Sequence, residues 1–342
     1  MGPRAFIAGV SGTALTAEER SFLRDSEPWG FIVFSRNVES PDQLKRLTAS
    51  LRDTVGRQAP ILVDQEGGRV QRLQAPHWPT YPSAAVYGRI YSCDPAAGVE
   101  AAHLGARLMA ADLAAIGIDV DCAPVADVPV PGADPVIGDR AYGNTAETVA
   151  ALGRAVADGL LDGGILPVLK HVPGHGRAEA DSHRALPVVD AERGVLEETD
   201  FAAFRALCDL PLAMTAHVVY TAIDPVAPAS TSAIVVSEVI RERIGFDGLL
   251  MSDDIAMGAL SGPIRQRARS AIAAGCDVVL HCDGMLSEMI AVASEVPVLG
   301  GHAAERAQVA LARRGNEESC DLVALRARWQ SMLHPVRREV VS

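Results

Sequence analysis

The chain has 342 residues, of which 49% are hydrophobic and 4% aromatic, so it can bury a large core and is neither a disordered chain nor a small disulfide-stapled protein. Its 31 basic and 43 acidic side chains give a net charge of −12, and no basic run occurs. This charge has the wrong sign for binding nucleic acid or an anionic membrane surface, so neither is expected as a partner.

Neither export nor membrane insertion is expected. The apolar run that follows Arg4 stops at Ser11, which is too short for a secretion signal, and no apolar stretch reaches the length of about 18 residues that a membrane span requires. The six cysteines include no CxxC pair, and several lie in apolar stretches, as in proteins of a reducing compartment. We therefore expect a soluble, cytoplasmic protein.

Eight short runs rich in Val, Ile and Leu predict buried strands. They begin near Ala5, Phe31, Ile61, Asp119, Leu166, Leu212, Leu249 and Asp277. Apolar residues at three- and four-residue steps predict helices between them, over Pro41–Val55, Ala96–Ile116, Thr145–Asp162, Glu197–Cys208 and Ile264–Ala274. Ser40 before Pro41, and Asn144 or Thr145 before Glu147, are typical helix starts.

Strand followed by helix, repeated about eight times, predicts an α/β protein with a parallel sheet. Eight such units favour a closed (β/α)₈ barrel of the TIM type, which typically needs about 250 residues. The alternative is a doubly wound open sheet, but Gly9–Thr13 lacks the GxGxxG spacing expected after its first strand. We expect one catalytic domain over 1–342, with a C-terminal helical tail from about residue 320 (Leu322–Leu333).

Polar clusters follow three of these strands, where a barrel collects its catalytic side chains. They are Asp64–Arg72, Lys170–Gly176 and Ser252–Asp254. A carboxylate such as Asp64 can accept hydrogen bonds from sugar hydroxyls, and Lys and Arg donate to hydroxyls or carboxylates. Asp64, Arg69, Arg72 and Arg140 together are typical of a polyol or sugar site, although each alone could be a structural ion pair.

Three histidines, His171, His175 and His183, fall within thirteen positions. They could hold a metal, but Pro173 and Gly174 make a helical zinc site improbable. In Asp181–His183, a carboxylate two residues before an imidazole can orient it and stabilise its charged form, as in a catalytic triad. Because imidazole ionises near neutral pH, His183 is a candidate general acid/base on a glycine-rich loop that could close over substrate.

Asp253 ends a predicted strand and is a candidate carboxylate nucleophile. It could instead cap a helix, although the neighbouring Asp254 suits that role better. Because adjacent strand residues diverge, we expect only one of the two to face the pocket.

Several strings resemble motifs of family 3 glycoside hydrolases, in the branch of bacterial β-N-acetylglucosaminidases of peptidoglycan recycling. They are VDQEGGRVQR (63–72), IGDRAYG (137–143), KHVPGHG (170–176), DSH (181–183) and MSDDIAM (251–257). The resemblance covers about residues 5 to 315. Val172, Ile255 and Ala256 depart from the usual residues, and each change is small.

The resemblance implies a (β/α)₈ barrel that retains anomeric configuration through a covalent glycosyl-enzyme. Asp253 would be the nucleophile, and His183 the acid/base with Asp181 as its partner, which departs from the usual two carboxylates. The terminal N-acetylglucosamine of a muropeptide would be held by residues that match the family motifs: Asp64, Arg72, Arg140, Lys170 and His171. His175 would shape the loop.

The resemblance implies neither a cofactor nor a metal. Phosphorolysis at the same site stays open, because a neutral imidazole does not repel phosphate as a carboxylate would. A metal-dependent barrel hydrolase and a catalytically inactive sugar-binding protein also stay open. The sequence leaves the oligomeric state unsettled, with a monomer favoured.

Overall fold

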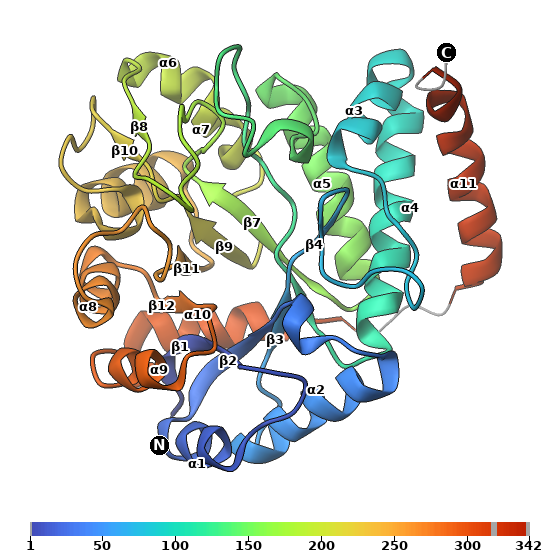
Figure 1. Ribbon diagram of the computed structural model, residues 1–342. Helices are drawn as coiled ribbons and strands as arrows, with labels where there is room; N and C mark the ends of the chain where they lie inside the picture. The colour runs from blue at the N-terminus through green and yellow to red at the C-terminus, as the bar shows by residue number, and fades with distance from the viewer. Residues whose placement is uncertain (1, 316–319, 340–342) are drawn as a thin grey trace.

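The chain folds into a closed barrel of eight parallel strands, in the order β1-β12-β11-β9-β7-β6-β3-β2 (Figure 1). This is a computed structural model that describes residues 2–315 and 320–339; residues 1, 316–319 and 340–342 of the expected domain lie outside the described residues. The barrel strands are β1 (Arg4–Gly9), β2 (Pro28–Val33), β3 (Ile61–Val63), β6 (Val120–Asp121), β7 (Leu166–Val172), β9 (Leu212–Thr215), β11 (Leu249–Asp254) and β12 (Val278–His281). The expectation of a (β/α)₈ barrel is confirmed.

All eight strands lie where the apolar runs predict them. Their residues are almost all buried, because helices cover the outside of the barrel and side chains fill its inside. Only β2 begins clearly earlier than expected, at Pro28 rather than near Phe31. Gly30 lies within this strand, where a Cβ would lie 3.0 Å from the carbonyl oxygen of Pro60, so the glycine allows the two segments to approach closely.

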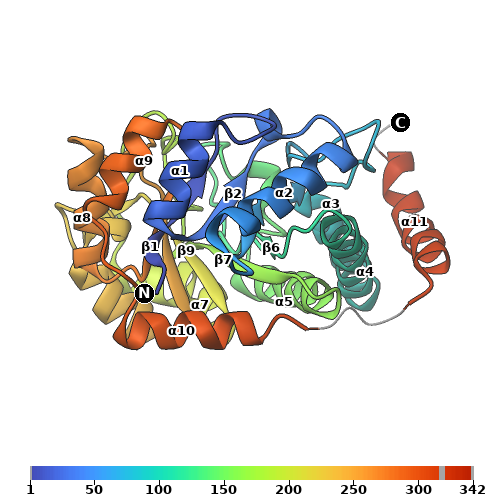
Figure 2. The same ribbon diagram turned by 90° about the horizontal axis from the view of Figure 1, so that it is seen from below.

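The helices surround the barrel strands, as Figure 2 shows from below. They are α1 (Ala17–Ser26), α2 (Pro41–Val55), α3 (Ala84–Cys93), α4 (Pro95–Ala114), α5 (Ala146–Asp162), α6 (Arg193–Glu198), α7 (Asp200–Arg205), α8 (Ile264–Ala274), α9 (Leu286–Ala293), α10 (Gly301–Ala312) and α11 (Leu322–Glu339), with a π-helix η4 (Val235–Ile244) and short 3₁₀ turns η1 (Ser35–Asn37), η2 (Gly138–Arg140) and η3 (Ala229–Thr231). Ser40 and Thr145 cap α2 and α5 through their side chains, as the start signals predict.

The single helix expected over Glu197–Cys208 is wrong, because α6 and α7 replace it and meet at Thr199. Asp200 turns inward there, and its buried carboxylate accepts a hydrogen bond from Arg177 Nε at 2.6 Å. Apolar periodicity cannot show this break, which coincides with an ion pair between Asp200 and Arg177 of the loop after β7. The helices α1, α3, α9, α10 and η4 were not expected.

Two small sheets lie beside the barrel. β4 (Gln65–Gly67) and β5 (Val70–Gln71) are antiparallel, whereas β8 (Val188–Val189) and β10 (Val219–Tyr220) are parallel. The first lies within the loop that follows β3, and the second joins the loop after β7 to the loop after β9. Among the described residues, no helix is both long enough and apolar enough to cross a membrane.

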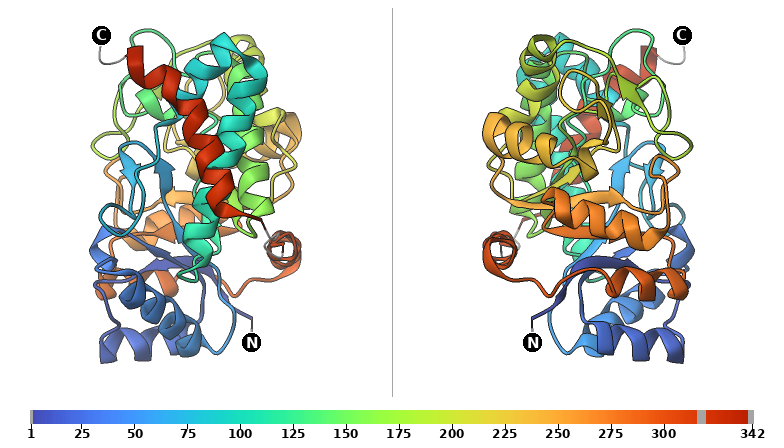
Figure 3. Two further views of the ribbon diagram at one scale, coloured as in Figure 1. Left: turned by 90° about the vertical axis from the view of Figure 1, so that its right-hand side faces the viewer. Right: turned by 90° about the vertical axis from the view of Figure 1, so that its left-hand side faces the viewer.

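The helical tail expected from about residue 320 is present as α11, which runs alongside α4 (Figure 3, left). Trp329 is its buried anchor, and its ring centroid lies 5.6 Å from that of Tyr81. The Tyr81 hydroxyl donates to Asp112 of α4 at 2.6 Å. The tail therefore packs against the far end of the loop that begins at Asp64.

Candidate active site

A cavity of about 500 Å³ opens at the carboxyl ends of the barrel strands. All eight residues to which the family resemblance assigns a role lie on its wall, and so does Arg69; the eight are Asp64, Arg72, Arg140, Lys170, His171, Asp181, His183 and Asp253. They come from four different strand-to-helix connections, so only the closed barrel brings them together. Met214, Leu280 and Cys282 add apolar wall between the polar groups.

One side of the cavity is lined by a network of alternating basic and acidic side chains. Lys170 Nζ, whose side chain is 2% exposed, lies 2.9 Å from Asp64 Oδ1 and 2.6 Å from Glu66 Oε1. Arg72 Nη2 donates to Asp64 Oδ2 at 2.8 Å, and Arg140 donates to both oxygens of Glu66, each at 2.8 Å. Each group fixes its neighbour, which gives a rigid set of donors and acceptors suited to hydroxyl groups.

The neighbouring opposite charges keep the side chains of this network ionised. Burial raises the pKa of Asp64, but the charges of Lys170 and Arg72 outweigh that effect and hold it well below its usual value. Burial lowers the pKa of Lys170, and the two carboxylates overcome this and raise it. Arg140 likewise has a raised pKa, since Glu66 outweighs its burial.

Replacing Glu66 with glutamine is expected to make stability less sensitive to acid. Burial raises the Glu66 pKa, but Arg140 and Lys170 overcome this and lower it from 4.5 to about 2. A carboxylate with a depressed folded-state pKa contributes stability above about pH 4.5, and this is lost as the pH falls toward about 2. The difference in unfolding free energy between wild type and Glu66→Gln, measured by urea titration, should shrink across this window.

The control is Glu39→Gln, which changes an exposed glutamate. Its difference from wild type should stay near zero throughout. A Glu66→Gln difference that stays constant from roughly pH 6 to pH 3 would contradict the assigned charge network.

His171 is the second-last residue of β7, and Asp127 orients its ring. Asp127 Oδ2 accepts from His171 Nδ1 at 2.7 Å, and Oδ1 accepts from the His175 amide at 2.6 Å. Burial raises the pKa of Asp127, but the two imidazoles and these hydrogen bonds lower it overall, so it is a carboxylate. This contact fixes the tautomer of His171 and leaves Nε2 as the ring nitrogen that can donate to a ligand.

Asp253 and Asp254 end β11, and both line the cavity, so the expectation that only one would face it is wrong. Burial raises the pKa of Asp253, but His217, His171 and the Asp254 amide outweigh it and lower the value. Burial raises the pKa of Asp254 to about 6, despite hydrogen bonds from the amides of Ala256 and Cys282. These environments separate the two neighbouring carboxyls, and Asp253 is the one that stays ionised to lower pH.

Asp254 holds Asp253 in place. The Asp254 amide donates to Asp253 Oδ1 at 2.8 Å, and the Asp254 carbonyl lies 2.9 Å from Nε2 of the buried His217. The helix that Asp254 was expected to cap is absent from the described segment; its carboxylate instead accepts from Ala256 N at 3.0 Å and so caps a turn.

Asp181 and His183 lie on the loop between β7 and β8. His183 Nδ1 lies 2.7 Å from Asp181 Oδ1, and the His183 side chain is 64% exposed at the cavity mouth. Burial raises the Asp181 pKa, but the hydrogen bonds and charge of His183 together outweigh it and lower the value overall. Because Asp181 fixes Nδ1 as a donor, Nε2 is the nitrogen that can exchange a proton with a ligand.

The three clustered histidines each have a separate partner. His171 is paired with Asp127, His183 with Asp181, and His175 Nε2 lies 3.0 Å from Ser182 Oγ. Across residues 2–315 and 320–339, no three His, Cys, Asp or Glu side chains are grouped to hold a metal ion.

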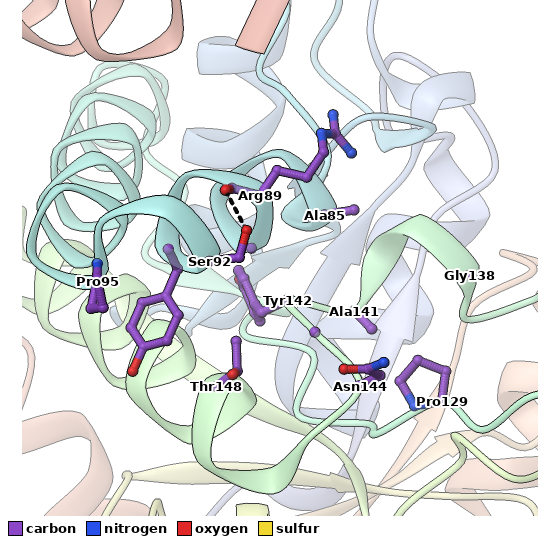
Figure 4. Close-up of a pocket in the computed structure, with 13 residues that line it drawn as sticks. Ala85, Arg89, Ser92, Pro95, Pro129, Gly138, Ala141, Tyr142, Asn144 and Thr148 are labelled. Atoms are coloured by element: carbon purple, nitrogen blue, oxygen red, sulfur yellow. Dashed lines mark hydrogen bonds between the residues drawn. The ribbon is translucent and has the colours of Figure 1, made fainter. Parts of the chain in front are cut away.

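A second cavity, of about 570 Å³, lies between α3, α5 and the segment that contains Tyr142 and Asn144 (Figure 4). In the part of the chain that the structure describes, its lining includes no carboxylate and no imidazole. It therefore lacks an acid/base pair. α3 packs tightly on this segment, since a Cβ on Gly88 would lie 1.9 Å from the Tyr142 carbonyl oxygen.

Sequence reasoning missed Glu66, Asp127 and His217. Glu66 lies inside a quoted motif but was not assigned a role, although its place between Asp64 and Arg69 was a usable signal. Asp127 and His217 follow short apolar runs, at Val125 and Met214, without the charge clusters that drew attention to the other strand ends. Their contribution is visible only through contacts with residues 44 and 37 positions away in the chain.

Known proteins resemble this chain over most of its length. The Glycosyl hydrolase family 3 N terminal domain matches residues 7–312. A "Beta-hexosaminidase" of Alkalilimnicola ehrlichii is 43% identical, covering 83% of this chain and 81% of that protein, and one of Aromatoleum aromaticum is 40% identical over 83% and 80%. The structure of NagZ from Neisseria gonorrhoeae in complex with N-trifluoroacetyl-D-glucosamine is 34% identical, with a TM-score of 0.84 over 98% of this chain and 97% of that one. The chain therefore belongs to glycosyl hydrolase family 3.

Proposed function

We propose that this glycoside hydrolase is a retaining, exo-acting β-N-acetylglucosaminidase that removes terminal GlcNAc from muropeptides in cell-wall recycling. One observation carries the proposal. The ionised Asp253 and the Asp181–His183 pair line the same cavity as the charged residues suited to a sugar ring. Family 3 membership and relatives named for β-hexosaminidase activity support the sugar class.

The first step forms a glycosyl-enzyme. An oxygen of Asp253 bonds to the anomeric carbon while the bond from that carbon to the leaving oxygen breaks. His183 gives its Nε2 proton to the leaving oxygen and becomes neutral. Asp181 holds Nδ1 and stabilises the charged imidazole before transfer.

The second step releases the sugar. Neutral His183 accepts a proton from water, whose oxygen bonds to the anomeric carbon as the Asp253 ester bond breaks. Two displacements on opposite faces restore the original configuration. Asp64, Arg72, Arg140, Lys170 and His171 would hold the hydroxyl groups throughout.

We place the protein in the cytoplasm on its cysteine pattern, and as a monomer that acts without cofactor or metal. The structure that contains N-trifluoroacetyl-D-glucosamine supports GlcNAc as the terminal sugar. The anhydro-muropeptide aglycone follows from the family resemblance.

The test uses a GlcNAc-anhydroMurNAc disaccharide, with a cellobiose-type β-glucoside as the comparison, and products identified by mass. We expect cleavage of the GlcNAc-anhydroMurNAc disaccharide and not of the β-glucoside. NMR of the reaction should show the β-anomer of GlcNAc as the first product. An initial α-anomer would exclude retention. GlcNAc-1-phosphate in phosphate buffer would identify a phosphorylase, and activity abolished by a chelator would identify a metal enzyme.

A further inference from the structure

The loop that carries His183 is anchored at both of its ends. At its start, the Tyr220 hydroxyl donates to the Gly174 carbonyl at 2.5 Å, and Arg177 pairs with Asp200. At its end, β8 is paired with β10. Between these anchors, residues 179–186 are mostly exposed, and Ser182 is the buried residue among them.

Ser182 connects this exposed stretch to the nucleophile's own loop. The Ala259 amide donates to the Ser182 carbonyl at 3.0 Å, and the Gly258 amide donates to the His183 carbonyl at 3.3 Å. Gly258 and Ala259 follow Asp253 by five and six positions. The backbone of the acid/base loop therefore rests directly on the segment that continues from Asp253.

Gly258 allows this close approach. A Cβ at that position would lie 2.8 Å from the His183 carbonyl oxygen and 3.1 Å from that of Arg184. The backbone of Gly258 is not left-handed, so an alanine there meets no obstacle except these two carbonyls.

The segment on which the loop rests, residues 255–259, is itself held by hydrogen bonds. Arg267 of α8 donates from Nη1 to the carbonyls of Ile255 and Met257, at 2.9 and 3.1 Å. The Met257 amide donates to the Asp254 carbonyl at 3.1 Å. This segment is therefore a platform whose position relative to Asp253 is set by hydrogen bonds.

We propose that Gly258 and Ala259 form a latch that docks the acid/base loop and so sets the position of His183 relative to Asp253. They are positioning residues, which act through the loop backbone. The inference rests on the proposed function of His183, because undocking matters for catalysis only if that imidazole delivers the proton.

Proton delivery gives the latch a selective signature. A poor leaving group such as phenol departs only when its oxygen is protonated, whereas 2,4-dinitrophenolate departs without that help. Loss of docking should therefore lower kcat/KM for a phenyl β-GlcNAc glycoside and leave kcat/KM for the dinitrophenyl glycoside nearly unchanged. A general loss of folding or of sugar binding would slow both.

The test compares Gly258→Ala with Gly194→Ala, since a Cβ on Gly194 meets no atom within 4 Å. For the phenyl glycoside, kcat/KM of Gly258→Ala, which reports formation of the glycosyl-enzyme, should fall at least about tenfold, a part of the roughly 10²–10⁴-fold that general acid catalysis supplies. For the dinitrophenyl glycoside it should stay within about twofold, and Gly194→Ala should match wild type on both. Equal losses on both substrates, or none, would overturn the latch.

Trypsin gives a readout that does not depend on catalysis. Arg184 is exposed in the docked loop, so release should speed cleavage after it by at least about fivefold in Gly258→Ala but not in Gly194→Ala. Unchanged cleavage would also overturn the latch. Should Gly258→Ala fail to fold, Ala259→Pro, which removes the amide that donates to the Ser182 carbonyl, is expected to give the same substrate selectivity and faster cleavage. If it gives neither, the latch is wrong.

His183→Ala separates the two proposals. If it shows the same leaving-group selectivity while Gly258→Ala does not, the latch fails and the proposed function stands. If His183→Ala lowers kcat/KM for both glycosides equally, the proposed acid/base role fails, and the catalytic role of the latch fails with it.

Discussion

Replacing Asp253 with alanine is expected to lower kcat/KM for an aryl β-GlcNAc glycoside by at least about 10³-fold, or about 4 kcal/mol of transition-state stabilisation. Asp253 is an ionised carboxyl at the end of β11, and its Oδ1 accepts from the Asp254 amide at 2.8 Å. Without it, the first displacement has no nucleophile. Activity within a few-fold of wild type would contradict the role given to Asp253.

Azide can show that Asp253→Ala loses activity because the nucleophile is missing and not because the protein is misfolded. In Asp253→Ala, azide can occupy the space of the missing carboxylate and attack the anomeric carbon directly, so a single displacement should yield an α-glycosyl azide. Asp53→Ala, on an exposed site of α2, should behave as wild type. Formation of the β-azide by Asp253→Ala would indicate that another group is still the nucleophile.

The fold could be predicted from the sequence because barrel strands buried on both faces leave short, uninterrupted apolar runs. All eight strands followed from these runs. The helices were harder to predict. α1 buries Glu19, Leu23 and Ser26, so it shows almost no apolar stripe, and its capping box at Thr16 was the signal to use.

The membership of the cavity was also predictable, because charged residues directly after apolar strands converge in a barrel. What the sequence could not supply is how those residues hold one another. Glu66 shares Lys170 with Asp64, and Asp127 orients His171 through a buried contact. Such pairs depend on strand register and loop path, which periodicity does not encode.

The same limit explains the misjudged Asp254. From the sequence, Asp254 suited the cap of a following helix better than Asp253 did, and only one of the two was expected to face the pocket. In the structure its amide, carbonyl and carboxylate are all engaged, with Asp253, His217 and the turn at Ala256 respectively. The role of a residue whose amide, carbonyl and carboxylate bond to three different neighbours becomes clear only when the positions of all three neighbours are known.

Replacing Lys170 with methionine is expected to weaken both folding and substrate binding. The change leaves Asp64 and Glu66 facing each other without the ammonium that lies 2.9 and 2.6 Å from them. Removing one partner of a buried ion pair typically costs about 3–5 kcal/mol. Urea denaturation should show a loss of this size, and KM for an aryl glycoside should rise because the hydroxyl-binding carboxylates lose their common anchor.

The chain offers a matched control, because Lys45 on α2 is exposed and is the other of its two lysines. Lys45→Met should leave the unfolding free energy and KM unchanged. Adding Glu66→Gln to Lys170→Met removes one of the two stranded carboxylates, so the double variant should be more stable than Lys170→Met alone. Additive losses would mean that Lys170 and Glu66 do not interact, and would contradict the charge network as the basis of the site.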